Sequence, residues 1–489
     1  MSDVVFRNHL LWSILGHNLE HGRGSDAALC SGERVLSYER LAAAVTRGAA
    51  QIDARFTEGS RLLVAARNQV HVALWLCAAL RSRSVPLLAD PTSGDRLAAL
   101  ANEWNVRAAV VDPPVQISTV TTISASEAED WLDAPLLRSF EPPAVADDEP
   151  AFWTFTSGTS GEPKAVVHAH RGPVAAYHGF ARAIVQLGPE DVTIATAGLP
   201  FVYALGNNFF FPLMAGATAV LPRDLLLPTV LGELARHGAT VLVAGPWSLA
   251  GIARSARRER WVEAIRQLRC VLSAGEPLPS GVLLEWKRRF GKELLDNLGC
   301  TEMFNSFVSN GPGRARPGSL GAVVPGFELR VGGEVPRPGA RGALAVRGES
   351  RAIAIGRAGE LASPEGAWCE TGDDVEVCAD GTLIFLGRRD DRFKVKGRFL
   401  HPLEVERVLA AVPGVAECLV TRDADASGIT VVVARIVSDG TAGDVVARAV
   451  MQQARARLEP HARPARVDVV AALPRSPRGK LQRRAITEG

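Results

Sequence analysis

Closely spaced cysteine pairs are absent from this sequence of 489 residues, and cysteine itself is scarce. The chain has seven cysteines: Cys30, Cys77, Cys270, Cys300, Cys369, Cys378 and Cys418. An odd number with no CxxC spacing argues against a disulfide framework and against a structural zinc site. This usage is typical of a reduced, intracellular protein.

Long apolar runs are also missing. The longest of them, such as Val72–Leu80, fall far short of the roughly 18–20 residues that a membrane helix needs. The first residues carry no basic leader followed by a long apolar core, so we expect no signal peptide. From these absences we expect a cytoplasmic protein without a membrane partner.

Neither sign of charge dominates, with 55 Lys and Arg against 53 Asp and Glu, so the composition does not indicate a nucleic-acid partner. The distribution is less even. Residues 388–489 hold 19 Lys and Arg against 12 Asp and Glu, a net charge of +7. Such a basic region suits an anionic partner, and an ordinary solvated surface explains it equally well.

The length and a hydrophobic content of 47% predict two or three domains. Strand-like and helix-like segments alternate: the expected strands are 61–66, 85–88, 108–111, 240–244 and 270–273, and the expected helices are 38–54, 70–81 and 248–256. This alternation predicts an α/β fold with largely parallel sheets covered on both faces. Residues 112–150, rich in Asp, Glu, Pro and Ala, are expected to form a surface connection.

The pattern changes after about residue 325, where short strands separated by Gly and Pro predict a small β subdomain. The expected strands are 328–331, 342–346, 374–377 and 382–386. A dense charged segment, Gly387–Arg392, comes next. It precedes a compact α+β module of helix 402–411, strands 416–421 and 429–437, helix 441–458 and strand 466–470. We therefore predict an N-terminal domain of residues 1–387 and a C-terminal domain of residues 388–489.

The most informative segment is residues 154–164, which read TFTSGTSGEPK. Its glycines let backbone N–H groups approach an anion closely, and its hydroxyl groups add further donors. Lys164 adds a positive charge on a flexible stem. The segment predicts a polyphosphate site, although Gly/Ser-rich runs also occur in linkers. It is not a Walker A motif, because two residues rather than four separate Gly158 from Gly161.

Four further segments contain residues suited to nucleotide chemistry. Ser273–Pro277 follows an expected strand, the position where α/β sheets bind ligands. Gly299–Glu302 places a hydroxyl beside a carboxylate, and Mg²⁺ prefers such oxygen ligands together with a nucleotide phosphate. Trp368–Asp373 ends in a carboxylate that can accept both hydroxyls of a ribose. Pro474–Lys480 supplies a lysine near the C-terminus, although such a segment, taken alone, is more often a solvated tail.

In this order and spacing, the motifs resemble those of the adenylate-forming superfamily: acyl- and aryl-CoA synthetases, adenylation domains of peptide synthetases, and luciferases. The resemblance extends from Leu36 to Lys480. It implies a large N-terminal domain of two α/β subdomains and a small β-barrel, followed by a mobile α+β C-terminal domain. It also implies an acid–thiol ligase, in which a carboxylate attacks the α-phosphate of ATP, giving acyl-AMP and pyrophosphate, and a thiol then displaces AMP.

The resemblance assigns roles to the residues that match. Lys480 would bridge the substrate carboxylate and the α-phosphate, Thr301 would contact the same two groups, and Glu302 would hold Mg²⁺. Positive charge is needed there because the attacking carboxylate and the triphosphate repel each other. The residues expected to bind the nucleotide are Thr156, Ser157, Gly158, Thr159, Ser160, Gly161 and Lys164 at the β- and γ-phosphates, Gly275, Glu276 and Pro277 at the adenine, and Asp373 and Arg388 at the ribose.

The C-terminal domain is expected to rotate at Asp390 between the two half-reactions, which withdraws Lys480 and presents another face. Gly397 matches the glycine beside which the pantetheine arm of the thiol passes. Lys394 would assist thioester formation.

Two positions depart from the family pattern. Leu298 stands where many members have a tyrosine that stacks on adenine, so apolar contact would replace stacking. Ile353–Gly356 stands in place of the usual Gly-Tyr pair. These departures affect the expected local geometry and leave the expected chemistry unchanged.

Leu199–Asn207 is expected to form the wall of the acyl pocket. Amino-acid-activating relatives place an Asp in this region, and none occurs between positions 192 and 223, so we disfavour α-amino acids on the cost of an unpaired ammonium. The pattern most resembles benzoate-type aryl-CoA ligases. Tyr203 would pack on an aromatic ring, with Ala274 and Gly299 leaving room for it. A short or medium aliphatic acid is the alternative substrate, and core packing is the alternative role for Tyr203.

The same resemblance favours coenzyme A as the acceptor thiol. The alternative is a stand-alone adenylation enzyme that loads an aryl or short acyl group onto the phosphopantetheine of an acyl carrier protein. A catalytically inactive nucleotide-binding sensor is disfavoured, because Lys480, Glu302 and Asp373 are all present. The protein is expected to be a monomer or a homodimer.

Overall fold

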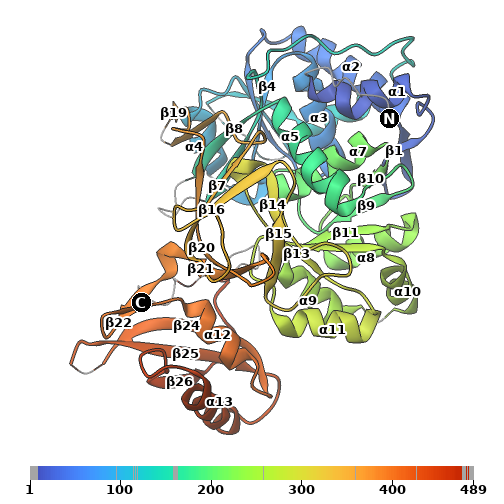
Figure 1. Ribbon diagram of the computed structural model, residues 1–489. Helices are drawn as coiled ribbons and strands as arrows, with labels where there is room; N and C mark the ends of the chain where they lie inside the picture. Colours follow the sequence, from blue (N-terminus) through green and yellow to red (C-terminus); the bar gives the residue numbers. More distant parts are fainter. Residues whose placement is uncertain are drawn as a thin grey trace.

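The computed structural model describes residues 9–94, 96–113, 115, 117, 119–157, 163–256, 258–357, 359–425, 427–475, 481 and 483. These residues form a large α/β domain followed by a small α+β domain, drawn in orange and red at one end of the molecule in Figure 1. The expected fold class is therefore confirmed. Among the described helices, none combines the length and the apolar character that a membrane crossing requires.

One sheet of the large domain contains eight strands within the described residues, in the order β19-β18-β8-β7-β4-β3-β5-β6. The strands are β3 (Arg61–Ala65), β4 (Val85–Leu88), β5 (Ala108–Val111), β6 (Thr121–Ser124), β7 (Pro150–Ser157), β8 (Pro163–Ala169), β18 (Ala354–Arg357) and β19 (Glu360–Ala362). The strands from β7 to β6 in this order pair in parallel. The apolar sequences of β3 and β5 are buried, as expected for parallel strands that are covered on both faces.

A second sheet contains thirteen strands within the described residues, in the order β16-β17-β20-β21-β15-β14-β13-β12-β11-β9-β10-β1-β2. The strands that pair in parallel are β1 (Ala27–Ser31), β9 (Val192–Ala195), β10 (Thr218–Val220), β11 (Val241–Ala244), β12 (Cys270–Ser273) and β13 (Leu295–Cys300), and β2 (Arg34–Ser37) joins β1 antiparallel. The antiparallel strands that match the expected β subdomain are β16 (Phe327–Val331), β17 (Arg341–Gly348), β20 (Cys369–Val377) and β21 (Leu383–Arg388). Two further antiparallel strands, β14 (Asn305–Ser309) and β15 (Ser319–Val323), precede the expected start of this subdomain and join it to β13.

Helices pack beside both sheets (Figure 1). They are η1 (Trp12–Gly16), α1 (His17–Glu20), α2 (Tyr38–Asp53), α3 (Gln69–Arg81), η2 (Pro91–Ser93), α4 (Arg96–Glu103), η3 (Ala125–Trp131), α5 (Arg171–Ala176), η4 (Tyr177–Val185), α6 (Val202–Leu205), η5 (Gly206–Phe210), α7 (Phe211–Ala215), α8 (Leu227–His237), α9 (Pro246–Ser255), α10 (Glu259–Gln267), α11 (Ser280–Phe290) and η6 (Thr301–Met303). The side chains of Ser37 and Asn68 each accept a backbone hydrogen bond at the start of α2 and α3, which explains where these helices begin.

The segment 112–150 differs from the expected surface connection. Strand β6 extends the eight-stranded sheet beside β5, and η3 buries Trp131 completely. The Trp131 ring packs edge-on against Trp75 at 4.6 Å, and its indole N–H donates to Gln51 at 2.9 Å. The expectation was wrong here because numerous polar residues surround a few large apolar side chains that supply the packing.

The stretch Ile353–Gly356, which stands in place of the usual Gly-Tyr pair, lies outside the β subdomain. Strand β18 leaves that subdomain and pairs antiparallel with β8 of the eight-stranded sheet. Sequence periodicity cannot distinguish the two sheets, because both accept short apolar strands. This crossover fastens the β subdomain to the strand that begins with Pro163 and Lys164.

The C-terminal elements are η7 (Arg389–Asp391), β22 (Phe393–Val395), β23 (Arg398–Leu400), α12 (Pro402–Ala410), β24 (Val415–Ala424), β25 (Thr430–Ser438), α13 (Gly443–Arg457) and β26 (Arg466–Val469). They enclose a core of their own, in which Val405, Leu409, Val432 and Val450 are buried. The expected helices and strands of this module lie within three residues of their predicted ends. The β22–β23 hairpin was not expected.

Candidate functional site

The polyphosphate segment spans the connection between two paired strands. Thr156, near the end of β7, pairs with Lys164, near the start of β8, and both residues are half-buried. Ser157 is the last residue of β7. The loop residues between the strands, Gly158, Thr159, Ser160 and Gly161, lie outside the described residues. The structure thus fixes the two ends from which this loop projects.

Lys164 meets the predicted magnesium ligand. Its Nζ lies 2.9 Å from Oε1 of Glu302, a residue 138 positions further along the chain. Both side chains are about four-fifths buried, with 24% and 20% of their area exposed. Burial alone would raise the pKa of the Glu302 carboxyl, but the Lys164 ammonium and several hydrogen bonds hold it below its usual value. Glu302 is therefore ionised at neutral pH.

Thr301 and Glu302 are positioned by a tight turn. Strand β13 ends at Cys300, the short helix η6 follows, and Phe304 takes a left-handed conformation before β14 returns antiparallel. A Cβ at Gly299 would lie 2.2 Å from the carbonyl oxygen of Asn305, so only glycine allows the two strands to approach this closely. This gives Gly299 a structural role; its place in the acyl pocket stays a prediction.

Asp373 and Arg388, the two residues predicted at the ribose, face each other across β20 and β21. Nη1 of Arg388 donates to Oδ1 of Asp373 at 2.8 Å and to the carbonyl oxygen of Thr371 at 2.9 Å. The Asp373 carboxylate is almost fully buried, with 5% exposed, whereas Arg388 is exposed. Arg388 thus orients a carboxylate that the surrounding strands already hold.

The segment predicted at the adenine, Gly275, Glu276 and Pro277, follows β12 directly. Gly275 has φ of +93°, which favours glycine, and it is exposed like Pro277, whereas Glu276 is half-buried. Ala274, predicted in the acyl pocket, is buried. Because β12 and β13 pair in parallel, this segment and the Thr301 turn leave the sheet at the same edge, where ligands bind in α/β folds.

Tyr203 belongs to a network of asparagine side chains that the sequence did not reveal. Its hydroxyl accepts a hydrogen bond from Asn297 Nδ2 at 3.2 Å. Asn207 Nδ2 donates to the Tyr203 carbonyl and to Asn305 Oδ1, each at 3.0 Å, and Asn305 Nδ2 donates to the carbonyl of Val202 at 3.2 Å. The network fastens α6 and η5 to β13 and β14. Asparagines within apolar strands were the signal that would have indicated it.

The residues predicted in the C-terminal domain are exposed. Asp390 lies in η7, Lys394 lies on β22 with its Nζ 4.9 Å from the ring centre of Phe399, and Gly397 has φ of +80° in the turn between β22 and β23. The predicted catalytic lysine, Lys480, lies outside the described residues. The bridging of the substrate carboxylate and the α-phosphate by Lys480 therefore stays a prediction.

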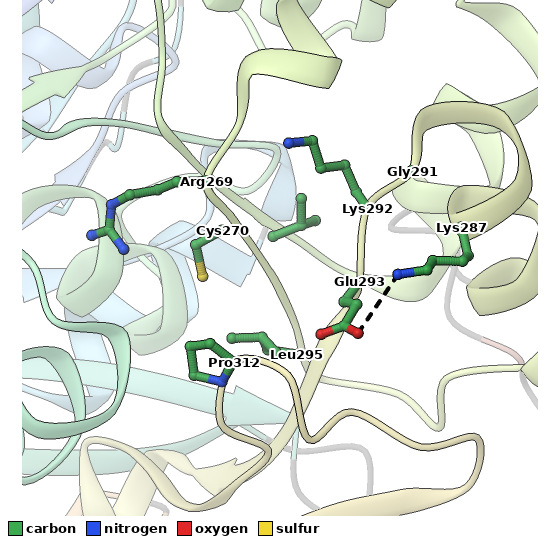
Figure 2. A pocket seen from close by; sticks show the side chains of 9 residues that line it. Arg269, Cys270, Lys287, Gly291, Lys292, Glu293, Leu295 and Pro312 are labelled. Carbon is green, nitrogen blue, oxygen red and sulfur yellow. Dashed lines mark ion pairs between the residues drawn. The ribbon is translucent and has the colours of Figure 1, made fainter.

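A surface cavity of about 250 Å³ lies apart from these residues (Figure 2). Cys270 and Leu295, which begin β12 and β13, are among its lining residues. Since the adenine segment and the Thr301 turn follow the opposite ends of these strands, the cavity is on the other edge of the sheet. Its Lys287 and Glu293 form an ion pair of 3.7 Å with each other. None of the predicted site residues lines it.

The residues present fit a magnesium ion that is shared with a nucleotide. Within the described ranges, no three His, Cys, Asp or Glu side chains lie close enough together to hold a metal. Mg²⁺ commonly takes only one or two carboxylates and completes its coordination with phosphate oxygens and water. Glu302 is ionised and lies beside the strands that carry the polyphosphate loop, so it could serve as the carboxylate ligand of such an ion.

Asp296 leads to a prediction about stability and pH. Burial raises the pKa of this β13 carboxyl to about 7, with Arg407 acting against the shift. The folded state therefore holds a proton that the unfolded state releases near pH 4. Stability from this group is present at low pH and lost as the pH rises toward 7. Between pH 4 and 7 the free energy of unfolding of the wild type, measured relative to that of Asp296→Asn, should fall by at most on the order of 4 kcal/mol.

Urea unfolding of both proteins at several pH values measures this difference. The comparison cancels the titration of buried histidines such as His168, which both proteins share. A wild type that gains stability relative to Asp296→Asn over this pH range would contradict the prediction.

Comparison with known proteins shows to which family the chain belongs. Residues 18–354 match the family model described as AMP-binding enzyme, and residues 404–480 match that of the AMP-binding enzyme C-terminal domain. The chain is 30% identical over 498 residues to benzoate–CoA ligase of Thauera aromatica, covering 96% of this chain and 94% of that protein. It is 34% identical over 447 residues to p-hydroxybenzoic acid–AMP ligase of Mycobacterium tuberculosis, covering 88% of this chain and 62% of that protein.

A solved structure shows the same fold. The crystal structure of the anthranilate CoA ligase AuaEII in complex with anthranoyl-AMP has a TM-score of 0.87 and 24% identity, covering 100% of this chain and 98% of that chain. The family model that matches residues 18–354, more than half of the chain, and the 30% identity to benzoate–CoA ligase show the family. The chain belongs to the AMP-binding enzyme family of the adenylate-forming superfamily.

Proposed function

We propose that this enzyme activates a small aromatic carboxylic acid with ATP to an acyl-AMP and then forms a thioester with coenzyme A. The single observation that carries the proposal is the meeting of Lys164 and Glu302 at 2.9 Å, because it joins the polyphosphate loop to the turn that carries Thr301. The aromatic acid is supported by the relatives named as a benzoate–CoA ligase and a p-hydroxybenzoic acid–AMP ligase.

The predicted residues take the following parts. In the first step a carboxylate oxygen of the acid bonds to the α-phosphorus of ATP, and pyrophosphate leaves with the electron pair of the broken P–O bond. Lys480 and Thr301 stabilise the charge at this centre, and Glu302 would hold Mg²⁺, which neutralises phosphate charge when it is bound. Asp373 and Arg388 hold the ribose.

In the second step the sulfur of the thiol bonds to the acyl carbon and the thiol proton passes to solvent. The acyl C–O bond breaks, and AMP leaves with its electron pair. We assign the passage of the pantetheine arm to Gly397 and assistance of this step to Lys394. The acceptor thiol is either that of coenzyme A, which we favour, or that of a carrier-protein phosphopantetheine, because the phosphopantetheine arm would contact the same residues in both cases. Because one relative is named as an AMP ligase, the experiment below also tests the carrier-protein alternative.

We further propose that the domains meet at residues 387 and 388 and that Asp390 is the hinge. The separate hydrophobic core after Phe393 supports this boundary. The cytoplasmic location and a monomeric or homodimeric state stay predictions.

Pyrophosphate release measured across a panel of carboxylic acids tests the proposal. Benzoate and hydroxybenzoates should exceed short and medium aliphatic acids, and adding CoA should convert the acyl-AMP to a thioester that mass spectrometry detects. Pyrophosphate release without CoA thioester, followed by acylation of a carrier protein, would establish the alternative. No release with any acid would reject both.

Tyr203 provides a test of the acyl pocket. Tyr203→Ala should lower kcat/KM for the aryl acid about 10- to 100-fold, because roughly 1.5–3 kcal/mol of aromatic packing is lost. The KM for ATP should change little. Tyr203→Phe keeps the ring, loses only the hydrogen bond from Asn297, and should retain most of the activity. A variant whose ATP binding falls more than its aryl-acid turnover would place Tyr203 outside the pocket.

A further inference from the structure

Asp374 is a buried carboxylate at the junction between the two domains. It follows the ribose residue Asp373 on β20, and only 2% of its side chain is exposed. Its Oδ2 lies 2.9 Å from Nη1 of Arg392 and 3.4 Å from Nε2 of His401, and its Oδ1 lies 3.8 Å from Nε of Arg389. The large domain thus supplies the buried carboxylate, and the segment after β21 supplies the two arginines and the histidine that surround it.

These partners lie on both sides of the proposed hinge, Asp390. Arg389 precedes it, whereas Arg392 and His401 follow it. Arg392 directly precedes β22, and His401 directly precedes α12; both elements contribute to the C-terminal core. A rotation at Asp390 would therefore separate Arg392 and His401 from Asp374 and leave Arg389 in place.

Other contacts join the same surfaces. Arg341 of β17 forms ion pairs with Glu376 of β20 and with Glu404 in the first turn of α12. The positive charge of Arg407, one turn further along α12, attracts the Asp296 carboxyl of β13 electrostatically. In Figure 1 α12 lies next to the lower ends of β20 and β21. The described structure is therefore one docked arrangement of the two domains, in which the Asp374 carboxylate is almost fully buried.

We propose that Asp374 acts through Arg392 and His401 as a clamp that holds the C-terminal domain in this docked arrangement and so sets the balance between the two half-reactions. The clamp rests on the proposed function, because it requires that the domains exchange arrangements at Asp390. Asp374 is a positioning residue in this scheme and contacts neither substrate.

The cost of leaving the docked arrangement explains why this carboxylate matters. A buried carboxylate that loses its cationic partner must be hydrated or paired again, which is costly. Rotation removes the closer contact, Arg392 at 2.9 Å, and retains only Arg389 at 3.8 Å. Weakening the clamp therefore favours the rotated arrangement over the docked one. Because each half-reaction uses one arrangement, the two rates should change by different amounts.

The two arginines form a matched pair for the experiment. Arg392→Gln and Arg389→Gln remove the same charge from the same carboxylate on opposite sides of the hinge. The two half-reactions are measured separately in the full-length enzyme, as pyrophosphate release from ATP and benzoate without CoA and as benzoyl-CoA formation from benzoyl-AMP and CoA. Arg392→Gln should change the two rates in opposite directions and alter their ratio about fivefold or more.

Arg389→Gln should leave this ratio within about twofold of wild type, and Arg392→Lys should restore most of it, because the ion pair is kept. Loss of both rates together in Arg392→Gln, or the same ratio in both glutamine variants, would overturn the clamp.

Small-angle X-ray scattering separates failure of the clamp from failure of the proposed function, because it needs no substrate. Arg392→Gln should enlarge the mean radius of gyration relative to the wild type and to Arg389→Gln. Unchanged scattering would overturn the clamp. If the wild type releases no pyrophosphate with any acid, the proposed function fails, and scattering alone still decides whether Asp374 holds the domains together.

Discussion

Replacing Glu302 by glutamine is expected to slow pyrophosphate release by a factor of about 10²–10³, which is the usual loss when one preorganised group is removed from a transition state. The carboxylate is ionised beside Lys164 and close to the strands of the polyphosphate loop. Glutamine keeps the size and one oxygen but removes the charge that suits Mg²⁺. The concentration of Mg²⁺ needed for half the maximal rate should rise in the variant.

Two controls separate this effect from a loss of folding. Glu328→Gln removes an exposed carboxylate whose partner is Arg347 on the neighbouring strand, and its rate should stay within about twofold of wild type. Glu302→Gln should still unfold in a single transition well above room temperature, because glutamine keeps the size of the side chain and an oxygen that can accept from Lys164. A slow variant that also unfolds at room temperature would leave Glu302 with a structural role only.

A variant with normal activity would contradict the assignment more directly. The ion pair between Lys164 and Glu302 would then serve only to neutralise the two partly buried charges. The double variant Lys164→Gln with Glu302→Gln tests that alternative: a purely structural pair predicts that the second substitution costs almost nothing after the first.

Much of the fold was predictable because its elements carry strong local signals. The strands β4, β5 and β12 have the bounds that their apolar runs predicted, since short apolar runs flanked by polar residues have few other uses. Helix α2 begins one residue after its capping Ser37, as its sequence indicated. The C-terminal module was equally readable, because its helices are amphipathic and its strands are short and apolar.

The failures have a common physical cause. Trp131 and the β18 strand are placed by contacts with residues far away in the sequence, namely Trp75 and the β8 strand. Local periodicity contains no information about such partners. A polar segment with a single large aromatic residue therefore resembles a loop until the surface that receives the aromatic ring is known.

The motifs of the candidate site could be predicted from the sequence, but the distances between their residues could not. Family motifs indicated Glu302 and Lys164 separately, whereas the distance between them depends on two sheets meeting. Asp374 illustrates the limit best. The motif that ends at Asp373 indicated that residue and not its neighbour, yet Asp373 lies beside Arg388 and Asp374 lies beside residues on both sides of the proposed hinge.

Lys480→Ala is expected to have the largest effect of all on the first half-reaction. Pyrophosphate release should fall by a factor of at least about 10²–10³, because a carboxylate and a triphosphate must approach each other without the charge that offsets their repulsion. Thioester formation from preformed benzoyl-AMP should remain close to wild type. In that step the carboxylate is already joined to the α-phosphate as a mixed anhydride, so it no longer carries the negative charge that Lys480 offsets.

Lys394→Ala is the reciprocal control. If the exposed β22 lysine assists the thiol step, its removal should spare pyrophosphate release and slow benzoyl-CoA formation. The two lysines would then show opposite patterns in the same pair of assays, which neither general misfolding nor a loss of ATP affinity can produce. Equal losses of both half-reactions in Lys480→Ala would mean that this lysine supports the fold or nucleotide binding, and the chemical role proposed for it would have to pass to Lys164, the described lysine that lies beside Glu302.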